Sequence, residues 1–159
     1  MSGVHKIDIK SLAKCLGISL GVGALSAIFT MFGTDSFEKA VKPPLTPPSF
    51  LFPIVWTILF ILMGISSYII SRSDSEHSTT ALLVYGIQLV VNFFWPVFFF
   101  NLQAYFFSFL WIILLWVLII VMIAKFYKVS KVAAWLQIPY LLWVTFATYL
   151  NFGIYLLNR

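Results

Sequence analysis

The sequence predicts an all-α integral membrane protein, a single domain (residues 1–159) built as a bundle of five transmembrane helices. Hydrophobic residues make up 62% of the chain and charged residues only 9%, whereas a soluble domain usually carries about 25% charged residues. The charge-free runs are about 20 residues long, which is the length of helix that crosses a hydrocarbon core. The sequence has no segments of alternating polarity, which disfavours a β-barrel.

The helices can be placed in chain order from the apolar runs and the polar residues between them. The first run follows Lys14, and the second follows the proline-rich loop 33–49 and ends before the polar stretch SRSDSEHS. Residues 79–124 carry no charge, yet at about 1.5 Å per residue one helix of that length would be about twice as long as a bilayer needs. This run therefore folds back at Asn101-Leu102-Gln103. The predicted helices cover about residues 12–32, 50–71, 79–100, 103–125 and 132–157.

Lysine and arginine residues predict how the bundle is oriented. More of them flank the end that carries the N-terminus than the end that carries loop 33–49, and cytoplasmic loops are enriched in these residues. We therefore expect the N-terminus in the cytoplasm, and loop 33–49 and the C-terminus outside. Since topology accounts for the net charge of +5, nucleic acid is not an expected partner. The N-terminal end has Lys6, Lys10, Lys14, Arg72, Lys125, Lys128 and Lys131, and the other end has Lys39, Lys42 and Arg159.

The predicted membrane interior lacks the groups that ordinary catalysis and ion coupling use. After Lys14, no Asp, Glu, Lys, Arg or His lies in the interior of a predicted helix. Proton relays and ion-coupled transporters need such groups at depth, and hydrolases need them as acids and bases. One cysteine, Cys15, and two distant histidines, His5 and His77, give no metal site. We expect no metal and no resident cofactor.

Asn92 is the most informative polar residue in the predicted helices. Pro96 lies four residues later and has no N–H to bond the carbonyl of Asn92. We therefore expect the third helix to kink there, with a free carbonyl beside an amide side chain. Such a pair is costly in lipid, so it should face protein, water or ligand. A helix–helix hydrogen bond and a ligand contact are equally compatible with the sequence.

Aromatic residues make up 19% of the chain, and some of them follow helical spacing with their neighbours on three helices. Most aromatic residues in such a chain simply face lipid or pack between helices. The stripes, however, all reach the half of the bundle nearest loop 33–49. They are Trp56, Phe60 and Met63 in the second helix, Asn92, Trp95 and Phe99 in the third, and Tyr140, Trp143, Ala147, Leu150 and Asn151 in the fifth.

The loop before the second helix carries two proline pairs, Pro43-Pro44 and Pro47-Pro48. Proline fixes φ and lacks an N–H, so these pairs should form a stiff, extended segment. Placed over the three stripes, this segment would act as a lid. We therefore predict an aromatic-walled cavity in the outer leaflet, enclosed by the second, third and fifth helices and suited to a flat, largely apolar ligand.

Small residues form one face of the first helix. Ser19, Gly23 and Ala27, with Gly17 and Gly21, predict close helix packing. The contact can be within one chain or across a dimer, and the sequence does not decide between them.

Leu150, Tyr155 and Arg159 fit a loose sterol-binding pattern, L/V-x₁₋₅-Y-x₁₋₅-K/R. An interfacial tyrosine and a terminal arginine explain these residues equally well, so the pattern carries little weight.

Three segments resemble motifs of the translocator protein family (TspO/MBR, formerly the peripheral benzodiazepine receptor). They are KPPLTPPSFLFPIVWTILFILMG, NFFWPVFF and IPYLLWVTFATYLNFGIYLLN. They occur in the family's order, one each at the predicted second, third and fifth helices. The similarity covers about residues 37–158. It implies a bacterial-type member of the family, with five tilted transmembrane helices and usually a homodimer, located in the bacterial cell membrane.

The resemblance also implies a ligand cavity covered by the loop between the first two helices. Members bind porphyrins and haem-related tetrapyrroles, sterols and synthetic drugs, so protoporphyrin or haem is the implied ligand. Some members degrade porphyrins with light and oxygen, which would assign catalytic tryptophans to Trp56 and Trp143. The implied ligand-binding residues are Pro47, Trp56, Phe60, Asn92, Trp95, Trp143, Phe146, Ala147 and Leu150.

Three positions depart from the family pattern. Ser36-Phe37 stands where Trp-Tyr is frequent, Leu45 replaces an aromatic residue of the loop, and Pro96 stands where a small hydroxyl residue is common. From these departures we expect a lid without aromatic groups that could stack on a ligand.

Overall fold

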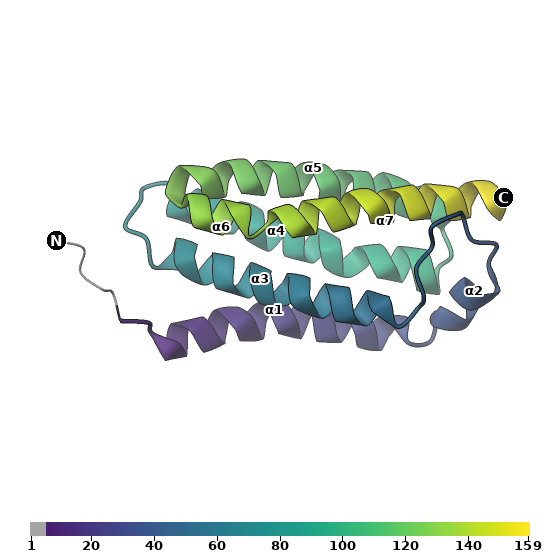
Figure 1. Cartoon of the computed structure of the whole chain (residues 1–159), viewed down its shortest axis with the longest axis horizontal. Coiled ribbons are helices and arrows are strands. Elements are labelled where there is room, and N and C mark those ends of the chain that lie inside the picture. The colour runs from purple at the N-terminus through teal and green to yellow at the C-terminus, as the bar shows by residue number, and fades with distance from the viewer. Residues whose placement is uncertain (1–5) are drawn as a thin grey trace.

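The computed structural model describes residues 6–159, which form a helical membrane bundle without any strand in that range (Figure 1). Within these described residues, five helical segments are long and apolar enough to cross a membrane, as predicted. The elements are α1 (Ile9–Thr30), α2 (Thr34–Lys39), α3 (Leu51–Ser71), α4 (Ser78–Pro96), the π-helical turn η1 (Val97–Asn101), α5 (Tyr105–Val129), α6 (Lys131–Trp135) and α7 (Ile138–Leu157).

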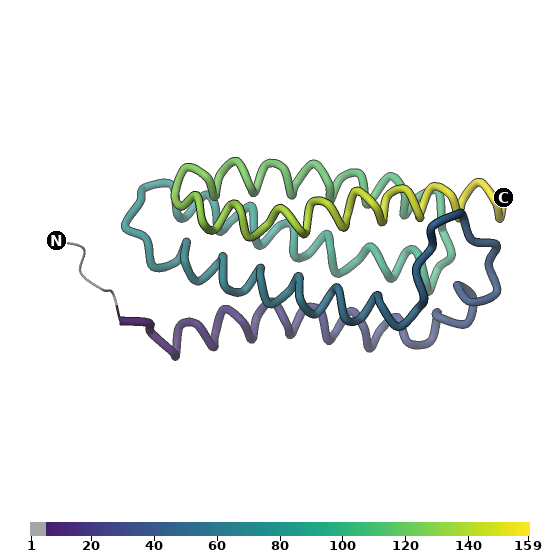
Figure 2. The backbone as a smooth tube through the Cα atoms, in the orientation of Figure 1, coloured from purple at the N-terminus to yellow at the C-terminus, as the bar shows by residue number. Residues whose placement is uncertain are grey.

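The long helices run side by side along the length of the molecule (Figure 2). α2, the proline loop and the C-terminus lie at one end of the bundle, and α1 begins at the other end (Figure 1). α1 packs on α3 and α4, whereas α5 packs on α4 and α7. The end that carries α2 is called the α2 end below.

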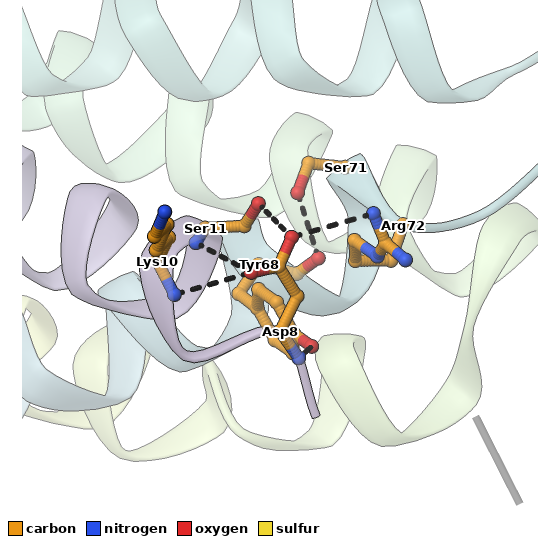
Figure 3. A network of polar contacts seen from close by, with 6 residues as sticks. All are labelled: Asp8, Lys10, Ser11, Tyr68, Ser71 and Arg72. Atoms are coloured by element: carbon orange, nitrogen blue, oxygen red, sulfur yellow. Dashed lines mark hydrogen bonds and ion pairs between the residues drawn. The ribbon is translucent and has the colours of Figure 1, made fainter. Parts of the chain in front are cut away.

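α1 begins at Ile9 rather than near residue 12, because Asp8 caps it. The Asp8 carboxylate accepts hydrogen bonds from the main-chain N–H of Lys10 (3.1 Å) and Ser11 (3.3 Å) and from the Ser11 hydroxyl (2.7 Å) (Figure 3). These bonds satisfy donors that a helix start otherwise leaves unpaired. Arg72, at the end of α3, lies 3.7 Å from the same carboxylate and so links the two helices at this end.

Proline residues set the irregular points of the third and fifth spans. α4 ends at Pro96 and continues as the π-helical turn η1, because a proline cannot complete the regular hydrogen-bond ladder. The predicted single helix at 132–157 is divided into α6 and α7, with Pro139 in the first turn of α7. Gln137 stabilises the division by donating to the Ser66 hydroxyl of α3 at 2.6 Å.

α1 approaches α3 closely at Gly64. A Cβ on Gly64 would lie 2.9 Å from the Cα of Leu16 and 2.7 Å from the Ser19 hydroxyl oxygen. The small residue is therefore what lets the two helices meet. Part of the small face predicted for α1 is thus used within the chain.

Candidate functional site

An apolar cavity of about 400 Å³ lies between α1, α3 and α4 at the α2 end. Its volume falls in the usual range for small-molecule sites, about 300–1,000 Å³. The lining residues come from five elements and from two residues outside them. They are Gly23, Ser26, Ala27 and Thr30 of α1; Met31, which follows α1; Thr34, Phe37 and Glu38 of α2; Ser49 of the loop before α3; Phe52, Pro53, Trp56 and Phe60 of α3; and Asn92, Trp95, Pro96 and Phe100 of α4 and η1.

Aromatic rings from α3 and α4 form the walls. Trp56 lies against Trp95, with ring centroids 6.4 Å apart and planes inclined by 33°, and Phe60 lies 5.8 Å below Trp56 on the same helix. Gly23 of α1 brings the opposite wall up to Phe60, because a Cβ there would lie 2.6 Å from the Phe60 ring. Broad, rigid, apolar faces of this kind suit a flat ligand.

The roof of the cavity is α2 rather than the proline pairs. Phe37 is buried and lines the cavity, and its ring packs edge-on against Phe52 (5.9 Å) and Phe100 (5.6 Å). The expectation of a lid without aromatic groups is therefore wrong. Pro47 does not belong to the lining.

The proline segment is instead fastened to α7. The Tyr149 hydroxyl donates to the Pro44 carbonyl at 2.8 Å, and the Asn158 side chain both accepts from the Val41 N–H (2.9 Å) and donates to the Val41 carbonyl (2.9 Å). Leu45 forms the exposed tip of the turn, with φ of 69°. The stiff segment thus ties the start of α3 to the C-terminal helix and leaves α2 over the cavity.

Asn92 takes part in a buried chain of hydrogen bonds and also lines the cavity. Its amide nitrogen donates to the Tyr140 hydroxyl at 2.6 Å, and that hydroxyl donates to Gln88 Oε1 at 2.7 Å. Gln88 Nε2 lies 3.9 Å from the sulfur of Met63. The helix–helix hydrogen bond expected as one alternative is present, and contact with a ligand stays a prediction.

Trp95 is held in the wall by its own buried partner. Its indole N–H donates to Asn151 Oδ1 at 2.9 Å, and the Ser108 hydroxyl donates to the same oxygen at 3.1 Å. Asn151 in turn donates to the carbonyl of Tyr105 at 2.9 Å. The indole plane is therefore fixed by contacts to α5 and α7 before any ligand enters.

The fifth span does not line the cavity, contrary to the predicted enclosure. Ala147 and Leu150 are buried in the bundle. Trp143 and Phe146 face an open apolar groove between α3 and α7, which they share with Val55, Ile58, Leu59, Pro139 and Leu142. A helix turns about 100° per residue, so Trp143 lies about 60° around α7 from Tyr140. That offset carries it from the buried stripe to the groove, and its ring also packs on Phe52 of α3, with ring centroids 5.8 Å apart.

The first span supplies the wall that sequence reasoning missed. Ser26, Ala27 and Thr30 lie one and two turns beyond Gly23 on the small-residue side of α1. In the sequence these positions belong to a row of small residues, which by itself indicates a packing face. Small side chains both permit close approach and, where the helices diverge, leave a hollow.

The loose sterol pattern does not form one surface. Leu150 is buried, Tyr155 packs on Phe106 with centroids 5.2 Å apart, and Arg159 is exposed at the C-terminus. Five residues of helix place Leu150 and Tyr155 about 140° apart around α7. Whether any of these residues contacts a sterol stays a prediction.

Within the described chain, Glu38 is the only charged residue that lines the cavity. It lies at the mouth, where the Ser49 hydroxyl donates to its carboxylate. Among residues 6–159, no group of three His, Cys, Asp or Glu side chains could hold a metal ion. The arrangement supports binding through apolar faces and a few hydrogen bonds, and it offers little for acid–base chemistry.

Comparison with known proteins gives consistent similarities along almost the whole chain. A family model described as the TspO/MBR family matches residues 15–157. The chain is 39% identical to the tryptophan-rich protein TspO of Chlorobaculum tepidum, over 95% of this chain and 98% of that protein. It is 33% identical to protein CrtK of Rhodobacter capsulatus, over 86% and 85% of the two chains. It is 31% identical to the translocator protein of Ovis aries, over 77% and 75%.

Proposed function

The chain belongs to the TspO/MBR family, and from that premise we propose that it is a translocator-type binding protein whose cavity takes flat hydrophobic ligands such as porphyrins or sterols. The observation that supports this most strongly is the cavity of about 400 Å³ between α1, α3 and α4, walled by Trp56, Phe60 and Trp95. Protoporphyrin or haem is the proposed ligand class to test first. The two indoles and the phenyl ring would lie against the ligand's flat face.

The bilayer is the natural source of such a ligand. The chain is a multi-pass integral membrane protein, and Ala27, Met31 and Pro53 of the lining are exposed on the outside of the bundle. A hydrophobic molecule dissolved in lipid could therefore reach the cavity without crossing water. Binding would then draw on apolar contact with the walls rather than on charge.

A fluorescence titration tests this proposal. Purified protein in lipid nanodiscs should show saturable quenching of tryptophan fluorescence when protoporphyrin is added, because Trp56 and Trp95 line the cavity. An unrelated membrane protein with five helices serves as the control. Quenching no greater than in that control would contradict the proposal.

Light- and oxygen-dependent degradation of porphyrin is the second candidate. The position of Trp56 on the cavity wall favours this activity, since its indole could meet a photosensitiser or the oxygen species that the photosensitiser forms. The position of Trp143 supports the activity less, since Trp143 lies outside the lining. A new absorbing product on illumination that is lost in Trp56→Phe and retained in Trp143→Phe would support this activity. Equal bleaching by both variants and the wild type would count against it.

Three further properties belong to the same proposal: a bacterial cell membrane, an N-terminus in the cytoplasm and a homodimer. The excess of lysine and arginine at the N-terminal end supports the orientation. Gly17 and Gly21 of α1 have no neighbour within 4 Å, which leaves part of the small face free for a second copy. Disulfide cross-linking of a Gly21→Cys variant in a Cys15→Ser background tests the dimer, and a wholly monomeric product would contradict it.

A further inference from the structure

The mouth of the cavity carries an unpaired negative charge. The Glu38 carboxylate accepts a hydrogen bond from Ser49, and among residues 6–159 it enters no ion pair. Two lysines lie close in sequence, Lys39 and Lys42, but neither forms an ion pair with the Glu38 carboxylate. The Lys42 ammonium donates instead to the main-chain carbonyl of Glu38 at 2.9 Å and lies 5.0 Å from the centroid of the Phe37 ring.

The hydroxyl groups of the lining all direct their hydrogens into the protein. Ser26 donates to the Phe93 carbonyl (3.4 Å), Thr30 to the Ser26 carbonyl (3.0 Å), Thr34 to the Met31 carbonyl (3.0 Å) and Ser49 to Glu38. A hydroxyl that has donated its single hydrogen retains its oxygen lone pairs as acceptors. The hydroxyls at the mouth therefore offer a ligand acceptors and no donors.

Free donors in the lining lie away from the mouth. In the described part of the chain no Lys, Arg or His belongs to the lining, and the Trp95 N–H and Asn92 amide nitrogen already have partners within the bundle. Trp56 carries the one lining indole whose N–H donates to no group among the described residues, and it lies on the wall between Trp95 and Phe60. Ser26 and Thr30 are buried, whereas Thr34, Ser49 and Glu38 are exposed, so the one negative charge and two of the acceptor hydroxyls lie at the entrance.

We infer that the mouth, formed by Glu38, Ser49 and Thr34, is a subsite for a hydrogen-bond-donating or cationic group, such as a protonated amine or a hydroxyl, on a flat apolar ligand. It selects against a carboxylate in that position. A carboxylate there would leave water to face oxygen lone pairs and a like charge, so it would lose hydration without gaining a partner in the cavity lining. This inference rests on the proposed function, because it assigns the ligand class of the same cavity.

The size of the effect follows from exposure. Glu38 is exposed to solvent, and exposed charge pairs change affinity by up to about fivefold. Salt screens such interactions over about 10 Å at 0.1 M ionic strength, so the selectivity should be largest in dilute buffer. For tetrapyrroles, the expected order is an amine-bearing derivative first, a neutral ester second and the free diacid last.

Three porphyrins with one ring system test the subsite: protoporphyrin, its dimethyl ester, and its bis-amide with aminoethyl arms. Each is titrated into the full chain in phosphatidylcholine nanodiscs, which carry no net charge, at low salt. The wild type should bind the amine about fivefold more tightly than the ester, and the diacid most weakly. Glu38→Gln keeps the shape of the side chain and an acceptor for Ser49, and it should bring the three affinities close together. Asp35→Asn, an acidic residue of α2 outside the lining, is the matched control and should keep the wild-type order.

The outcomes separate this inference from the proposed function. If all three porphyrins bind saturably but the diacid is equal or tightest, the donor subsite is overturned and the cavity proposal stands. An amine preference that survives in Glu38→Gln, or disappears in Asp35→Asn, also overturns it. If none of the three binds saturably, both proposals fail.

Discussion

Pro43 of the proline loop lies directly against Gly153 of α7, so that a Cβ built on Gly153 would come within 2.6 Å of the Pro43 ring. The contact stands beside the hydrogen bonds from Tyr149 and Asn158 to the same loop. A rigid proline ring has little freedom to move aside. The glycine therefore makes room for the loop at the point where it crosses α7.

Gly153→Ala should loosen the loop. The added methyl group must displace Pro43, which weakens the neighbouring hydrogen bond from the Val41 N–H to Asn158. Hydrogen exchange of the Val41 amide should become faster. Gly86→Ala is the control, since nothing lies within 4 Å of the position of its Cβ. Unchanged exchange in Gly153→Ala would mean that Pro43 does not hold the loop in place.

Tyr140→Phe should destabilise the bundle by about 1–3 kcal/mol, the usual cost of leaving buried polar groups without a partner. The substitution removes the hydroxyl that joins Asn92 to Gln88 and keeps the ring. Thermal unfolding in detergent measures the change. Tyr127→Phe, an exposed tyrosine of α5, should have almost no effect. Equal behaviour of the two variants would show that the chain of hydrogen bonds contributes little.

Gly23→Ala should weaken ligand binding severalfold. Its methyl group would lie 2.6 Å from Phe60, so the ring must move into the cavity floor or α1 must withdraw. Gly21→Ala makes the same chemical change on the same helix with no neighbour within 4 Å. Titration with protoporphyrin compares the two. A loss of affinity in Gly21→Ala but not in Gly23→Ala would contradict the assignment of this wall.

Asp8 should make the start of α1 sensitive to acid. Hydrogen bonds from the Ser11 hydroxyl and the Ser11 N–H lower the pKa of Asp8 below its usual value of 3.8. A carboxyl with a depressed pKa stabilises the folded state above its unfolded-state pKa, and this contribution is lost as the pH falls through the folded-state value. The stability difference between wild type and Asp8→Ala should therefore be full at pH 7 and shrink below about pH 4.

Asp74→Ala is the control for that measurement, because Asp74 is an exposed acidic residue of the loop between α3 and α4. It should show no comparable pH-dependent difference from the wild type. A difference for Asp8→Ala that stays constant from pH 7 to pH 3 would show that the cap does not depend on the charge.

The helices and two of the three stripes could be predicted from the sequence for physical reasons. A charge-free run of bilayer length has few alternatives to a membrane helix, and Trp56, Phe60 and Met63 keep the spacing of one helix face. The stripe with Asn92 and Trp95 likewise reaches the cavity. The periodicity of one helix is enough to predict which of its residues share a face, wherever that whole face meets a single environment.

The arrangement of the walls depends on contacts that no local pattern contains. Helical spacing groups Trp143 with Tyr140, because they are three residues apart, but Trp143 lines the α3–α7 groove and neither residue lines the cavity. α1 was assigned to packing because its small residues have no polar or aromatic signature. The spacing of the prolines predicts a segment over the cavity, whereas the bonds of Tyr149 and Asn158 and the contact of Pro43 with Gly153 place it on α7.

Filling the cavity from α1 is the most direct test of the site. Ala27 belongs to the lining, whereas Ala24, one turn earlier on the same helix, is exposed and outside it. Protoporphyrin affinity is measured for Ala27→Trp and Ala24→Trp in nanodiscs, with helical content checked by circular dichroism. The binding site described above predicts at least a tenfold loss for Ala27→Trp and wild-type affinity for Ala24→Trp. Wild-type affinity in a folded Ala27→Trp variant would contradict it.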